Sequence, residues 1–82
     1  MMNFEEFERR LIAYLQELVR SGEISERGLA RITGVSQPHV HNVLKGKRYF
    51  SLETADEILR ELHMDLLDLI EPEELLEWTR RR

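Results

Sequence analysis

The fold is decided within residues 25–45, which read SERGLARITGVSQPHVHNVLK. Two short helical patterns follow one another in this stretch. Each is preceded by a serine, whose hydroxyl can accept a hydrogen bond from a backbone N–H of the first turn. The first helix of this pair is predicted over about residues 26–33 and ends at Gly34, which takes positive φ without steric cost. The second is predicted from Ser36 to about residue 45, so only a tight turn fits between the two.

The pattern of apolar, small and turn residues continues beyond this pair. The positions that carry it are Leu29-Ala30, Gly34-Val35-Ser36-Gln37, Val40, Val43-Leu44 and Gly46-Lys47, and then Ser51-Leu52-Glu53-Thr54 and Leu62-His63-Met64-Asp65-Leu66. This set closely resembles the lambda-repressor/Cro-like (XRE-type) helix-turn-helix family, and the resemblance covers about residues 4–70. It implies an all-α domain of five or six helices that binds double-stranded DNA.

The matched positions have steric reasons. Ala30 is small where the two helices cross, and Gly34 supplies the positive φ of the turn. Leu29, Val40 and Val43 fill the wedge between the helices and hold them at a fixed angle. The second helix of such a pair stands out far enough to enter a major groove about 12 Å wide.

Helical periodicity also predicts elements outside the motif. The first helix of the whole chain, which precedes the motif, begins after Asn3 and ends near Gly22. The spacing of Asn3 to Glu6 is that of a capping box. Its apolar stripe consists of Phe4, Phe7, Leu11, Leu15, Leu18 and Val19. The fourth helix begins after Ser51, and its buried stripe consists of Leu52, Ala55, Ile58, Leu59 and Leu62.

One or two short helices are predicted after the fourth. His63 occupies a stop position where glycine is usual, so backbone strain is expected there. Asp65 can cap a fifth helix that contains Leu66, Leu67, Leu69 and Ile70. Pro72 then either breaks the chain or opens a sixth helix.

The composition is that of a soluble globular chain, with 82 residues of which 41% are hydrophobic and 34% charged. There is no cysteine, which excludes disulfides and thiolate metal sites. The formal net charge of −4 is unevenly spread: residues 1–26 carry −3 and residues 51–82 carry −6, whereas residues 27–50 hold five cations and no acid. These cations are Arg27, Arg31, Lys45, Lys47 and Arg48. A localised positive field of this kind favours a polyanionic partner.

The resemblance implies DNA contacts from the second helix of the motif. Outward positions of that helix touch base edges in the family, and here they are Gln37, Pro38, His41, Asn42 and Lys45. Gln37 is the best candidate, because its amide can pair with N6 and N7 of adenine. Positions expected at backbone phosphates are Ser36, Lys47, Arg48 and Tyr49, with Arg27 and Arg31 as further cations. Glu26 departs from the pattern, since many relatives have a glutamine near this position that holds a phosphate, and a carboxylate would repel one.

Other kinds of site are not indicated. His39 and His41 lie two apart, a spacing that directs helical side chains away from each other, so no metal site is predicted. No combination of residues typical of catalysis appears, and we expect no enzyme, no cofactor and no small-molecule ligand. No apolar run approaches the roughly 20 residues of a membrane helix, and a cytoplasmic location is expected.

We expect one domain over residues 1–82, with the motif at 25–45 and a C-terminal extension at 71–82. The apolar residues in and beside this extension are Ile70, Leu75, Leu76 and Trp78. They predict either a homodimer interface or packing against the first helix. The predicted function is sequence-specific DNA binding by a transcriptional regulator, most simply a repressor. The alternatives are a protein-interaction module that kept the fold, and the antitoxin partner of a toxin.

Overall fold

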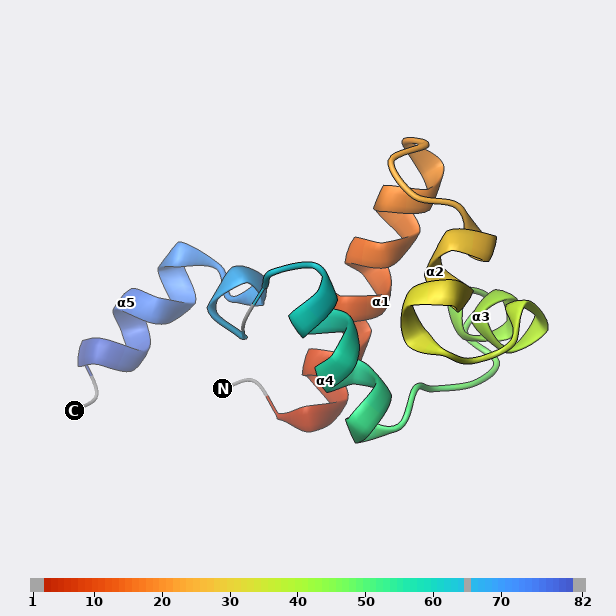
Figure 1. Cartoon of the computed structure of the whole chain (residues 1–82). Coiled ribbons are helices and arrows are strands. Elements are labelled where there is room, and N and C mark those ends of the chain that lie inside the picture. The colour runs from red at the N-terminus through yellow and green to blue at the C-terminus, as the bar shows by residue number, and fades with distance from the viewer. Residues whose placement is uncertain (1–2, 65, 81–82) are drawn as a thin grey trace.

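Every regular element is helical within residues 3–64 and 66–80, which the computed structural model describes. The elements are α1 (Phe4–Arg20), α2 (Glu26–Thr33), α3 (Gln37–Leu44), α4 (Leu52–Glu61), the 3-10 helix η1 (Leu66–Leu69) and α5 (Pro72–Arg80) (Figure 1). This confirms the predicted all-α fold. None of the described helices is long and apolar enough to cross a membrane. Asp65, with its predicted cap, lies outside the described part, as do the side chains of Leu66, Leu75 and Trp78.

Helix caps confirm the predicted starts of α1 to α4. Each of Asn3, Ser25, Ser36 and Ser51 has an extended backbone, and its side chain accepts a hydrogen bond from the backbone N–H three residues later. The donor–acceptor distances range from 2.8 to 3.3 Å. Such a bond satisfies one of the N–H groups that a helix leaves unpaired at its start.

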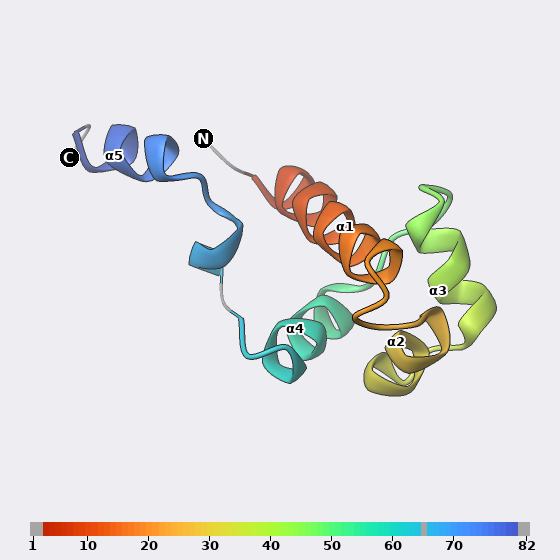
Figure 2. The ribbon, with the colours of Figure 1, turned by 90° about the horizontal axis from the view of Figure 1, so that it is seen from above.

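The core is formed by α1, α2, α3 and α4, which lie together in Figure 2, apart from α5. α1 packs against α3 and η1, and α2 packs against α3 and α4. The side chains that solvent does not reach come from all four helices and are Leu11, Leu15, Leu29, Val40, Val43, Ala55 and Ile58. Phe50, between α3 and α4, belongs to the same cluster. Burial of these side chains drives folding, and it fixes which faces of α2 and α3 stay outside.

One prediction of burial, that of Leu52, is wrong, and the apolar stripe of α1 is not buried over its whole length. Phe4 and Leu52, each the first residue of its helix, are 51% and 64% exposed. A helical side chain leans toward the N-terminus of its helix, and at a first residue this direction leads past the edge of the core. The other residues of the two predicted stripes are buried or half-buried.

The segment after α4 also differs in part from its prediction. His63 has φ +56°, which confirms the expected strain at this non-glycine residue. The fifth helix is a single 3-10 turn instead of an α-helix, a form common for helices of only four residues. Leu67 in this turn is exposed and Leu69 is buried.

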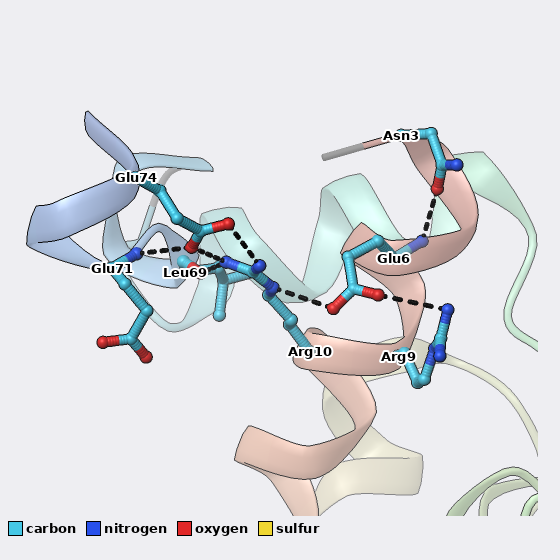
Figure 3. A network of polar contacts seen from close by, with 7 residues as sticks. All are labelled: Asn3, Glu6, Arg9, Arg10, Leu69, Glu71 and Glu74. Carbon is cyan, nitrogen blue, oxygen red and sulfur yellow. Dashed lines mark hydrogen bonds and ion pairs between the residues drawn. The ribbon is translucent and has the colours of Figure 1, made fainter. Parts of the chain in front are cut away.

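α5 confirms the predicted sixth helix and lies apart from α2 and α3. Figures 1 and 2 both place it on the opposite side of α1 from that pair, and the molecule is elongated, measuring 42 × 22 × 20 Å. Arg10 of α1 ties it to the body by donating hydrogen bonds to the carbonyl of Leu69 and the carboxylate of Glu74 (Figure 3).

Candidate nucleic-acid interface

α2 and α3 form a helix-turn-helix pair whose inner side chains hold its geometry. Gly34 ends α2 with φ +76° and donates its N–H to the carbonyl of Ala30 at 2.9 Å. Leu29, Val40 and Val43 are inaccessible to solvent, as predicted for the residues that fill the wedge. A Cβ atom at position 34 would meet no atom within 4 Å. The turn therefore needs glycine for its backbone conformation and not for space.

One face of α3 is open to solvent, because Val40 and Val43 turn inward. Of the five predicted base-contacting residues, four are exposed: Gln37, Pro38, His41 and Lys45. Gln37, His41 and Lys45 follow one another at intervals of four residues, which places them along one side of the helix. The fifth, Asn42, is half-buried, and its carbonyl accepts the N–H of Lys47 at 2.9 Å. The structure thus gathers four candidates on one open surface and partly covers Asn42.

The residues predicted to contact phosphates all reach solvent. They are Arg27 and Arg31 on α2, Ser36 at the start of α3, and Lys47, Arg48 and Tyr49 in the connection after α3. The hydroxyl of Ser36 accepts the N–H of His39 at 3.3 Å as a helix cap. A hydroxyl that accepts a hydrogen bond keeps its own hydrogen for a further acceptor, such as a phosphate oxygen.

The cations near this surface differ in their pairing from four of the five described arginines elsewhere. Four arginines form salt bridges with carboxylates: Arg9, Arg10, Arg20 and Arg60. Within the described part of the chain, none of the five cations between residues 27 and 50 makes one. Their charge is not neutralised by neighbouring carboxylates and is available to a bound anion.

Sequence reasoning misses one contact on this surface. Nδ1 of His41 lies 3.2 and 3.3 Å from the two carboxylate oxygens of Glu26, so the first turn of α2 is joined to α3. The acid that departs from the family pattern thus has a partner. His39 turns elsewhere and stacks on Phe50, with ring centroids 6.2 Å apart and an interplanar angle of 9°. In the described part of the chain, no cluster of side chains could hold a metal ion.

The residues predicted to form a dimer interface are described in part. Ile70 is half-buried, and Leu76 on α5 is 59% exposed. The side chains of Leu75 and Trp78 lie outside the described part, so packing of Trp78 against α1 stays a prediction, as does the interface.

Comparison with known proteins identifies a family. The sequence model of the Cro/C1-type HTH DNA-binding domain matches residues 15–75. This stretch runs from within α1 to within α5 and includes α2, α3 and all five cations between residues 27 and 50. No curated protein and no solved structure matches the chain.

Proposed function

Because the chain belongs to the family of Cro/C1-type helix-turn-helix DNA-binding domains, we propose that it recognises a specific sequence of double-stranded DNA and regulates transcription, most simply as a repressor. The observation that carries this proposal is an exposed face of α3 beside five cations that have no carboxylate partner among the described residues. Repression requires binding alone, because a bound domain occludes the DNA from polymerase. The proposal places the protein in the cytoplasm, together with that DNA.

In this proposal, α3 enters the major groove. Gln37 reads adenine through N6 and N7, while His41 and Lys45 meet further base edges. The phosphate contacts orient the domain without reading sequence, and they come from Arg27, Arg31, Ser36, Lys47, Arg48 and Tyr49. Partial burial makes Asn42 a weaker candidate reader than its exposed neighbours.

We also propose that two copies pair through α5. One motif contacts only part of a helical turn of DNA, whereas a dimer places two reading helices about 34 Å apart on one side of the duplex. α5 has Glu73 in its first turn and Arg80 in its last, so antiparallel packing of two copies brings opposite charges together. The exposed Leu76 supplies apolar surface for the contact. Since α5 lies across α1 from α3, such pairing leaves the α3 face free.

The salt dependence of duplex binding tests the proposed function. A selection from random duplexes supplies the preferred site, and its affinity is then measured over a range of salt concentrations. If about four phosphates are neutralised, the log–log slope of the binding constant against salt is about −3.6. A slope near zero, or no binding to any duplex at low salt, contradicts the proposal and favours a protein-interaction module.

A further inference from the structure

The contact between Glu26 and His41 joins an acid to a residue on the open face of α3. Both carboxylate oxygens of Glu26 lie within 3.3 Å of Nδ1 of His41. The side chain of Glu26 is 29% exposed and that of His41 is 48% exposed. The imidazole is thus the more exposed of the two partners.

The chemistry of this contact decides which ring nitrogen carries hydrogen. An ionised carboxylate only accepts hydrogen bonds, so Nδ1 must be the donor. In a neutral imidazole, the other nitrogen then has a free lone pair and accepts. The two nitrogens of an imidazole ring point in nearly opposite directions, so Nε2 points away from Glu26.

We propose that Glu26 is a positioning residue for base selection, which rests on the proposed DNA-binding function. It holds His41 in the Nδ1–H tautomer, and Nε2 therefore selects a base that offers a hydrogen in the major groove. Cytosine and adenine offer one from their amino groups, whereas guanine N7 and O6 and thymine O4 are acceptors. An acceptor facing the lone pair of Nε2 leaves both atoms without a partner.

A simpler interpretation gives Glu26 no part in base selection. Its charge lies in the first turn of α2, where a carboxylate interacts favourably with the helix dipole. In that case, its only effect on DNA is repulsion of phosphates. Such repulsion weakens binding to all sequences alike and does not depend on His41, so the two interpretations predict different results.

The first experiment observes the tautomer in the free, full-length chain. Nitrogen-15 NMR of the histidine rings is recorded at about pH 8.5, above the range in which imidazoles usually charge. We expect His41 to show hydrogen on Nδ1. In Glu26→Gln, a carboxamide that both donates and accepts leaves either tautomer possible, so Nε2–H appears. The control Glu23→Gln removes the same charge from the preceding loop and should leave the ring unchanged. Hydrogen on Nε2 in the wild type overturns the proposal but leaves the proposed function standing.

The second experiment measures affinity for duplexes that differ at one base pair, at the same pH. The wild type should prefer an amino-bearing base at the His41 position by about five- to tenfold, the worth of one hydrogen bond of roughly 1 kcal/mol or a little more. Glu26→Gln should lose most of this preference, and the double variant with His41→Ala should match His41→Ala alone. A uniform gain on every sequence that persists in the His41→Ala background overturns the proposal. Failure of the wild type to bind any duplex contradicts the proposed function itself, and the role of Glu26 falls with it.

Discussion

The guanidinium of Arg10 donates two hydrogen bonds of 2.6 Å to the carboxylate of Glu74, one from each terminal nitrogen (Figure 3). It also donates to the carbonyl of Leu69 at 2.9 Å and to Glu6 at 3.1 Å. Glu74 in turn accepts the backbone N–H of Glu71 at 3.0 Å. Paired hydrogen bonds between an arginine and a carboxylate fix both distance and orientation. This contact therefore sets how α5 sits on α1.

The first prediction is that Arg10→Gln loosens α5 while α1 to α4 stay folded. An amide cannot replace the two charged hydrogen bonds to Glu74, so backbone amides of α5 should exchange faster with solvent when followed by NMR. Arg9→Gln is the matched control, because Arg9 is 67% exposed and its ion pair is with Glu6. Unchanged exchange in α5 of the Arg10 variant would show that other contacts hold this helix.

The same contact has a pH signature. The hydrogen bonds from Arg10 lower the pKa of Glu74 from its ordinary 4.5 to about 2. Stabilisation of the docked helix is therefore complete above pH 4.5 and is lost as the pH falls toward 2. Carboxyl NMR should report this low value in the wild type and a return toward 4.5 in Arg10→Gln. An ordinary pKa for Glu74 in the wild type would mean that the pair does not persist in solution.

The second prediction concerns Glu8, which is 2% exposed and has no hydrogen-bond partner for either carboxylate oxygen among the described residues. Burial raises the pKa of Glu8 above its ordinary 4.5. The folded chain prefers the protonated acid, so the unfolding free energy falls as the pH rises from 4.5 through the raised pKa.

Replacing Glu8 should remove this penalty. Glu8→Met should raise the unfolding free energy by about 1–3 kcal/mol at neutral pH, because a buried group without a partner disappears. The gain should shrink at pH 4, where the acid is protonated in both states. Urea denaturation at several pH values measures it, with the exposed Glu5→Met as the control. A loss of stability at every pH would show that the carboxylate has a stabilising partner in solution.

The local parts of the fold could be predicted from the sequence. A serine cap acts within three residues and a left-handed glycine within one turn, so α2 and α3 were located within a residue of their ends. The buried Glu8 also had a signal, since it precedes Leu11, Ile12 and Leu15 at helical intervals of three, four and seven. The periodicity places Glu8 on the buried face of α1, but its charge is typical of an exposed residue, so the sequence alone did not assign it to the core.

Contacts between distant side chains left no such signal. Glu26 and His41 are 15 residues apart, and Arg10 and Glu74 are 64 apart. Each pair meets only because packing of whole helices brings the backbones together. A pattern of residue types records which face is buried, but not which exposed charges end up opposite each other. The exposed residues of the candidate DNA surface could therefore be proposed from the sequence, whereas the contact between Glu26 and His41 could not.

The third prediction is that position 34 requires glycine, because its backbone has a φ of +76°. Gly34→Ala should cost about 1 kcal/mol of unfolding free energy, and Gly34→Val more, because a β-branched side chain resists the left-handed region. Gly34→Asn is the control and should cost less than alanine, since asparagine tolerates this conformation. Thermal and urea unfolding measure the series. A valine variant as stable as the wild type would contradict the proposed strain.

The fourth prediction separates base reading from phosphate binding. Gln37→Ala should relax preference at one base pair and cost about 1–3 kcal/mol on the best site. Lys47→Ala should weaken binding to all sequences alike and make the salt slope shallower by about one contact. Both side chains are exposed, so neither variant should unfold the domain. Equal losses on every sequence for Gln37→Ala would mean that another part of α3 reads the bases.

The fifth prediction is that removal of α5 abolishes the proposed dimer. Sedimentation at micromolar concentration should give a dimer for the full chain and a monomer for a chain truncated after Glu71. Leu76→Glu should act like the truncation, because it places a charge on the exposed face of α5 without disturbing the core. Leu52→Glu is its control, being a leucine of similar exposure on α4.

The monomeric variants should keep the base preference set by α3 but lose affinity for a site with two half-sites, since each copy then binds alone. A dimer that survives truncation would locate the interface elsewhere. A full chain that is monomeric both free and on DNA would end the dimer proposal, while the α3 surface and the five cations between residues 27 and 50 would still account for binding to a single half-site.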